Sequence, residues 1–324
     1  MSNPVVKSLI DTWHIVPGPL IIMFISLYAA QVLIETGLFK RMEFIGRPLV
    51  MLAHLPQGAG ITFMASFGSV LAGNAMTARL YQEKRIDRTQ TLLTALLNTT
   101  PVYVKEIFTY QIPVMIPLLG IKVGFLYFLT FIASGLIKIL FVMIYGRVAL
   151  KDSQPGICPV NVDSRARRMA PEKKIGDVLV SSFSRQKNVF FKVSAVFIAT
   201  TFLIFLLINT NSIAGVSDYV GPLTDFFKLP SSCVLPIATY MFSPLVGASS
   251  IGAMLKDGML NDLQGITACL LGSLLMLPVF TLRYSFARYI SIFGFSLGTT
   301  ILSISTGLGM LNRGAFLFFF LCMS

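Results

Sequence analysis

Long apolar stretches alternate with short polar ones along most of the chain. A helix needs about 20 mostly apolar residues to cross a bilayer. Six stretches meet this length: about 17–35, 89–118, 121–146, 193–209, 262–293 and 295–322. Two further apolar stretches, 57–81 and 231–255, are rich in Gly, Ser and Pro, which interrupt regular helices. The pattern predicts an all-α integral membrane protein.

The composition agrees with this interpretation. Of the 324 residues, 55% are hydrophobic and 12% are charged, and the mean hydropathy is +0.76. An ordinary soluble domain has about 25% charged residues. These values exclude a soluble globular enzyme and a nucleic-acid-binding domain, and they make the lipid bilayer the first expected partner.

A basic segment divides the chain. Residues 147–192 contain ten of the 26 Lys and Arg residues and interrupt the apolar pattern. Because Lys and Arg concentrate in cytoplasmic loops, we expect a cytoplasmic linker here and a multi-pass protein in the cell (plasma) membrane. The predicted membrane regions are 1–146 and 193–324.

The two membrane regions resemble each other. When the chain is shifted by 174 residues, Leu55-Pro56 aligns with Leu229-Pro230, and Gly120 aligns with Gly294. Residues 46–124 align without a gap and give 14 identities in 79 pairs. The repeated Pro and Gly positions mark equivalent interruptions of the backbone. The sequence therefore predicts an internal repeat.

The basic loops predict the topology of each repeat. Segments 40–54 and 79–88 are both basic and both favour the cytoplasmic side. The intervening 57–81 is then a re-entrant helical hairpin, and each repeat has about three transmembrane helices, an interfacial helix and the hairpin. An odd number of crossings inverts the second repeat. In the alternative, 57–81 and 231–255 span the membrane and the repeats are parallel.

Inverted repeats with interrupted helices are typical of secondary transporters. Non-helical backbone is tolerated inside a membrane where it lines a cavity or is buried in protein. We expect the two hairpins to meet near the midplane and expose backbone and small polar side chains to a solute. The predicted substrate-binding residues are Ser66, Ser69, Asn74, Asn98, Thr99, Ser243, Ser249 and Ser273.

Charged residues inside membrane segments are a second class of candidates. Glu106 is the predicted ion-coupling residue, with Na⁺ or H⁺ as the ion. Lys138 and Arg313 lie within the last helix of each repeat. For Lys138 we expect the side chain to extend toward the basic cytoplasmic face.

Signatures of enzymes are missing from the sequence. It has no catalytic triad, no glycine-rich phosphate loop, and no zinc-ligand spacing among its four Cys and two His residues. We therefore expect no enzymatic activity, no cofactor and no resident metal.

Several short motifs resemble a known family. They are Glu35-Thr36-Gly37-Leu38-Phe39-Lys40-Arg41, Leu55-Pro56, Phe67-Gly68-Ser69-Val70-Leu71-Ala72-Gly73, the charged loop 82–88, and Pro101. Residues 34–118 and, more weakly, 208–292 resemble the Gate, or nucleoside-recognition, domain. Concentrative nucleoside transporters and the membrane part of ferrous-iron transport protein B share this domain. Ser69 and Asn98 stand where the iron transporter has cysteine-containing motifs.

The resemblance and the topology together predict a permease for a small polar solute, which the resemblance suggests is nucleoside-like. Alternating access between the two repeats would move the solute. The resemblance leaves a homo-oligomer open, and nothing in the residues decides the oligomeric state. Two alternatives remain open. One is a non-transporting membrane component whose basic linker docks a partner or anionic lipid. The other is divalent metal transport, as in ferrous-iron transporters.

Overall fold

The computed structural model describes residues 3–17, 46–150 and 221–323, with scattered positions at 20–28 and 183–210. Within these described residues every regular element is a helix, so the all-α class is confirmed. The predicted linker and the predicted spans 17–35 and 193–209 lie largely outside the described residues.

The helices before the linker include two short hairpin helices and one long final helix. Their bounds are α1 (Pro4–Ile15), α4 (Gly46–Leu52), α5 (Gln57–Gly68), α6 (Val70–Gln82), α7 (Arg88–Leu97), α8 (Thr100–Glu106), the π-helix η2 (Ile107–Met115), α9 (Ile116–Leu119) and α10 (Ile121–Ala149).

The helices after the linker follow the same order of short and long elements. Their bounds are the 3₁₀ turn η3 (Ser231–Cys233), α13 (Val234–Phe242), α14 (Pro244–Lys256), α15 (Asp262–Phe280), the π-helix η4 (Thr281–Ser285), α16 (Phe286–Phe293) and α17 (Phe295–Met323).

Three helical stretches are long and apolar enough to cross a membrane: Ile121–Ala149, Asp262–Phe293 and Phe295–Met323. They coincide with three of the predicted spans and support a membrane protein. The predicted span 89–118 is interrupted, because α7 ends at Leu97 and α8 begins at Thr100. The hydroxyls of Thr99 and Thr100 donate to the carbonyls of Leu96 and Leu97, at 2.7 and 2.8 Å, in the last turn before the break.

The stretch 57–81 forms two helices. Ser69 separates α5 from α6 with an extended backbone (φ −157°, ψ 118°), and Ser243 separates α13 from α14 in the same way. Helix α6 folds back on α5, which places Gly73 against Ser66 and Gly58 against Leu80. At 1.5 Å per residue each helix is about 18–20 Å long, which is shorter than the roughly 30 Å hydrocarbon core.

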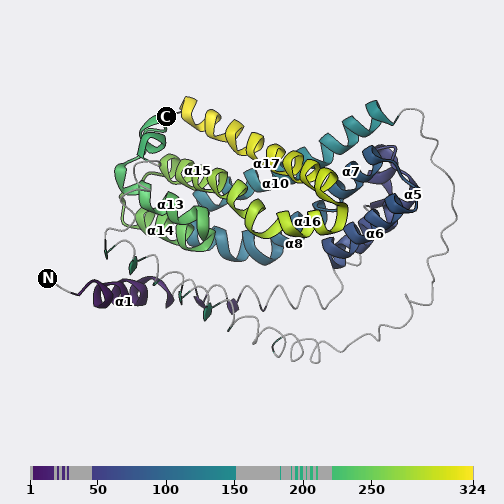
Figure 1. The fold of residues 1–324 in the computed structure, drawn as a ribbon. Coiled ribbons are helices and arrows are strands. Elements are labelled where there is room, and N and C mark those ends of the chain that lie inside the picture. The colour runs from purple at the N-terminus through teal and green to yellow at the C-terminus, as the bar shows by residue number, and fades with distance from the viewer. Residues whose placement is uncertain are drawn as a thin grey trace.

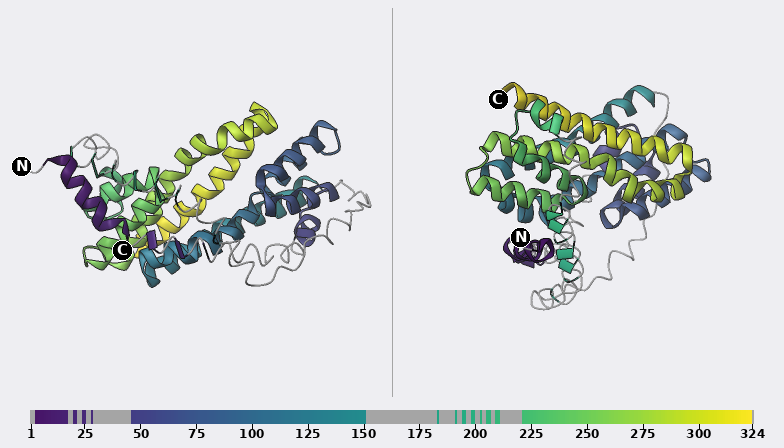
Figure 2. Two further views of the ribbon diagram at one scale, coloured as in Figure 1. Left: turned by 90° about the horizontal axis from the view of Figure 1, so that it is seen from below. Right: turned by 60° about the vertical axis from the view of Figure 1, so that its left-hand side comes forward.

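The prediction that the hairpins meet near the midplane is wrong. Figures 1 and 2 show α5 and α6 at one end of the molecule and α13 and α14 at the other. The centre is occupied instead by α10 and α17, which cross each other (Figure 1).

Two hydrophobic cores lie at the two ends, and each combines elements from both sides of the linker. One core joins Met115 and Val123 to α13, α15 and the end of α17. The other joins α5, α6 and α7 to Ile301, near the start of α17. The two membrane regions therefore interlock through their final helices.

Gly252 of α14 packs directly against the backbone of Leu118 in α9. A Cβ atom at this position would collide with the Leu118 backbone oxygen. We expect Gly252→Ala to lower the free energy of unfolding by about 1–3 kcal/mol. Gly307→Ala is the control, since nothing lies within 4 Å of its Cβ position. It should be neutral or stabilising by up to about 1 kcal/mol. Unfolding of both variants in detergent tests this, and equal stabilities would contradict it.

Candidate functional site

Helices α10 and α17 run antiparallel where they cross. Lys138 of α10 contacts Ser305 of α17, whereas the earlier residue Ser134 contacts the later residue Asn312. Residue numbers therefore rise along one helix as they fall along the other. We call the polar residues at and around this contact the crossing site; they are Lys138, Ser305, Asn312 and Arg313 of the two helices, together with Ser273 of α15 and Glu106 of α8.

Lys138 is the centre of the crossing site. Its side chain is 7% exposed, and it is the one buried Lys, Arg, Asp or Glu in the described part of the chain. The amine donates a 2.8 Å hydrogen bond to the Ser305 hydroxyl and lies 5.1 Å from the centre of the Tyr103 ring. The prediction that this side chain extends to the cytoplasmic face is therefore wrong, because these two partners hold it inside the protein.

Asn312 occupies the corresponding place on α17, 174 residues after Lys138. Its amide donates to the Ser134 hydroxyl at 2.6 Å and to the Thr130 carbonyl at 3.0 Å. The Asn312 Oδ1 atom is buried and has no hydrogen-bond partner among the described residues. A buried acceptor without a donor is costly, so this oxygen is a candidate contact for a bound group.

Arg313 joins α17 to α15. Its Nε donates to the Ser273 hydroxyl at 2.9 Å, and its Nη1 donates to the Gly309 carbonyl at 3.4 Å. Glu106 lies within electrostatic range of Lys138, Arg313 and Lys105. No described acidic oxygen lies within 4.0 Å of the Lys138 or Arg313 nitrogens. The two cations and the carboxylate thus share one region without forming a contact ion pair.

A second polar group connects α6 and α7, and we call it the amide cluster. Asn98 is 0% exposed, and its amide donates to Asn74 Oδ1 at 3.2 Å and to Thr77 Oγ1 at 3.0 Å. The Tyr289 side chain lies beside Asn74. Asn98 Oδ1 is buried without a partner in the described residues. Asn74 and Asn98 are therefore brought together as the sequence interpretation requires.

The other predicted residues bond mostly to their own helices. The hydroxyls of Ser66, Thr99, Ser249 and Ser273 donate to backbone carbonyls three or four residues earlier, at 2.7–2.9 Å. Ser69 caps α6 by accepting from the Ala72 amide, whereas Ser243 makes no such cap bond. Among these residues only Ser273 also bonds a charged side chain, that of Arg313. The predicted residues thus form separate local groups.

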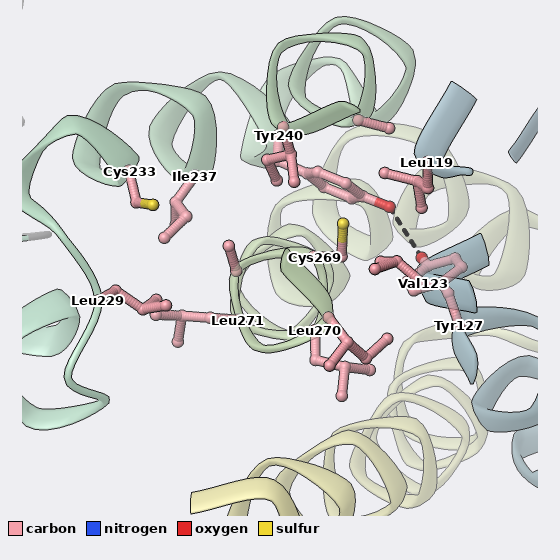
Figure 3. Close-up of a cluster of buried hydrophobic side chains, with 14 of the residues drawn as sticks. Leu119, Val123, Tyr127, Leu229, Cys233, Ile237, Tyr240, Cys269, Leu270 and Leu271 are labelled. Carbon is pink, nitrogen blue, oxygen red and sulfur yellow. Dashed lines mark hydrogen bonds between the residues drawn. The ribbon is translucent and has the colours of Figure 1, made fainter. Parts of the chain in front are cut away.

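Two tyrosines link the second hairpin to α10. The hydroxyl of Tyr240 donates to that of Tyr127 at 2.8 Å, inside the apolar cluster shown in Figure 3. Both side chains are buried among Leu119, Val123 and Cys269, which are labelled in the same view. This bond holds α13, a hairpin helix, against the long helix that carries Lys138.

Removal of one tyrosine hydroxyl tests this link. We expect Tyr240→Phe to lower the free energy of unfolding by about 0.5–1.5 kcal/mol. Tyr127→Phe should cost a similar amount, and the double variant should cost less than the sum, because one shared bond is lost. Chemical unfolding of the three variants measures this. Strictly additive costs would show that the two hydroxyls do not interact.

Sequence reasoning missed Asn312 and Ser305 as members of a site. One signal could have found Asn312, since the 174-residue shift aligns it with Lys138. Ser305 aligns with Phe131, so the repeat gives no hint of its role. Its position follows only from the antiparallel crossing of two helices far apart in the sequence.

Three proteins of Methanocaldococcus jannaschii that are described as uncharacterized are similar to this chain. The chain is 26% identical to uncharacterized protein MJ1556 of Methanocaldococcus jannaschii, over 94% of this chain and 95% of that protein. It is 22% identical to MJ0880, over 83% and 86%, and 20% identical to MJ0871, over 90% and 88%, both from the same organism. No family model matches the chain. No solved structure matches it either.

Proposed function

We propose that the chain is a membrane permease for a small polar solute, built from two inverted Gate-like repeats that give alternating access to the crossing site. The observation that carries this proposal is Lys138, a buried cation close to the middle of a membrane-length helix. Ionisable groups inside a membrane are costly, and they typically mark solute or ion pathways.

Element bounds support the repeat. Helices α10 and α17 begin at 121 and 295 and end at 149 and 323, and both π-helices begin at positions 174 residues apart. The capping boxes of α7 and α15, Asp87 with Gln90 and Asn261 with Gln264, follow the same shift. Gly120 and Gly294 precede the final helices with nearly equal φ angles, 80° and 78°. Equal backbone geometry at equal spacing is what an internal repeat requires.

The direction of the helices supports inversion. If the repeats were related by an axis along the membrane normal, α10 and α17 would cross the membrane in the same direction. Their contacts are antiparallel instead. The loop after α6 carries Lys84 and Arg85, whereas the loop after α14 carries only Lys256 at its edge, and this asymmetry favours opposite sides of the membrane.

Interrupted helices support a transport role. Helix α7 ends before α8 begins, and each repeat contains a π-helix: η2 follows α8, and η4 follows α15. π-Helical turns are rare and occur frequently at functional sites. Because they are already irregular, such segments can bend as a site opens to one side or the other. Glu106, the last residue of α8 before η2, lies within electrostatic range of both cations and is the proposed coupling residue for Na⁺ or H⁺.

Accessibility of Ser305 tests the proposal without a known solute. The four native cysteines (Cys158, Cys233, Cys269 and Cys322) are replaced, and Ser305→Cys is introduced as the reporter. A membrane-impermeant thiol reagent is then added to right-side-out and to inside-out vesicles. Alternating access predicts reaction from both sides in separate experiments, because the same residue faces each side in turn.

Leu136→Cys is the matched control. Leu136 lies two residues before Lys138 on α10, and its side chain is 53% exposed on the outer surface. In a membrane this position faces lipid, so the impermeant reagent should not reach it from either side. A Ser305→Cys reporter that reacts from neither side, or from one side only, would contradict alternating access.

The alternative functions have less support in the described residues. The basic linker proposed to dock a partner or anionic lipid lies outside the described residues beyond Leu150. For divalent metal transport, the described residues supply no group of three or more His, Cys, Asp or Glu side chains placed to hold a metal ion. A homo-oligomer stays a proposal that cross-linking in the native membrane can test.

A further inference from the structure

We propose that the crossing site recognises the anionic group of its solute, a carboxylate or a phosphate, through Lys138 and Arg313. This inference rests on the proposed permease function and names the class of solute. It uses Lys138, Arg313 and Glu106, of which sequence reasoning placed only Glu106 in the predicted site.

The balance of charge favours an anion. Three cations lie within electrostatic range of the Glu106 carboxylate: the buried Lys138, the part-buried Arg313 and the exposed Lys105. The remaining members of the crossing site, Ser305, Asn312 and Ser273, are neutral. With Lys138, Arg313 and Glu106 ionised, the crossing site therefore carries one excess positive charge, without counting Lys105. Inside a protein such a charge acts more strongly than in water, so it attracts an anion and repels a cation.

The N–H donors of Lys138 and Arg313 that make no bond within the described residues also favour an anionic solute. Lys138 has three N–H donors and gives one to Ser305. Arg313 gives Nε to Ser273 and Nη1 to Gly309, which leaves the Nη2 donors available. Because no described carboxylate lies within 4.0 Å of either group, both can still bind an oxyanion directly. Arginine is well suited to this task, since its planar fork matches carboxylate and phosphate oxygens.

The neutral residues suit a solute that also has polar groups. Asn312 is 2% exposed, and its Oδ1 atom has no hydrogen-bond donor among the described residues. It can accept a hydrogen bond from a hydroxyl or an amine of the solute. An inorganic anion would use the cations alone, whereas an organic acid or a phosphorylated solute would use both.

Charge selectivity of the Ser305→Cys reporter tests this inference. The reporter is treated with two methanethiosulfonate reagents of similar size, one with a sulfonate and one with a trimethylammonium group. The rate at which each reagent modifies Ser305→Cys is divided by the rate at which the same reagent modifies a simple thiol in solution. We expect the sulfonate reagent to be favoured. Lys138→Met and Arg313→Gln should each reduce this preference by about tenfold, as expected for the loss of one nearby charge in a site of intermediate dielectric.

Lys105→Gln is the control for loss of a positive charge. Lys105 is exposed and its side chain bonds no described member of the crossing site, so the preference should change less than about twofold. Reaction without preference for the sulfonate, or a preference that survives both Lys138→Met and Arg313→Gln, would overturn the inference while the permease proposal stands. No reaction of either reagent from either side would overturn the permease proposal and the inference with it.

Discussion

Replacing Asn98 by leucine is expected to lower the free energy of unfolding by about 2–4 kcal/mol. The Asn98 amide donates hydrogen bonds to both Asn74 Oδ1 and Thr77 Oγ1 in a fully buried position. Leucine donates nothing, so two buried polar atoms would lose this donor, at about 1–3 kcal/mol for each atom left unsatisfied. Denaturant unfolding of the purified protein measures the change.

A double-mutant cycle provides the control for this prediction. Asn74→Leu removes the partner and should also destabilise the protein. The Asn74→Leu, Asn98→Leu variant should lose at least 0.5 kcal/mol less than the sum, roughly the smallest coupling seen for residues in contact. If the two losses simply add, or if Asn98→Leu is neutral, the amide cluster does not form as described.

Lys138→Met is expected to remove ligand binding with little change in stability. Methionine fills the space of the lysine side chain. Replacing a buried charge by an apolar group of similar volume is often neutral, because the cost of desolvating the charge disappears. A solute present at 100 times its Kd should stabilise the wild type by about 2.7 kcal/mol. In Lys138→Met we expect that stabilisation to be lost.

Thermal unfolding with solute pairs that differ mainly in charge measures this. Suitable pairs are succinate with succinamide, glutamate with glutamine, and uridine monophosphate with uridine, each with and without Na⁺. The charged member should raise the Tm of the wild type and of the control Lys105→Met, but not of Lys138→Met. A charged solute that stabilises Lys138→Met as strongly as the wild type would contradict the role of Lys138.

The local features of the fold were predictable because local chemistry determines them. Gly and Ser in 57–81 marked a helix break, and the structure has it at Ser69. The apolar lengths of 121–146 and 295–322 predicted long helices, and α10 and α17 extend them by only a few residues. A buried amide must satisfy several hydrogen bonds, which makes Asn74 and Asn98 candidate site residues in the sequence. The structure pairs them.

The arrangement of these elements was not predictable from one sequence. The separation of the hairpins depends on how α10 and α17 pack, which no local pattern encodes. The expected direction of the Lys138 side chain assumed a lipid-facing helix, but Ser305 and Tyr103 hold the amine inside. The bond from Arg313 to Ser273 joins residues 40 apart in sequence. Each of these errors concerns a contact between helices rather than a property of one helix.

The central claim is that the chain consists of two inverted repeats. The most direct test is to determine on which side of the membrane two equivalent loops lie. Arg85 and Met259 are 174 residues apart, and both are exposed in the short loops that follow α6 and α14. Each is replaced by cysteine in the background without native cysteines and treated with an impermeant reagent on intact and inverted vesicles. We expect Arg85→Cys to react only from the cytoplasmic side and Met259→Cys only from the opposite side. Reaction of both from the same side would contradict the inverted repeat.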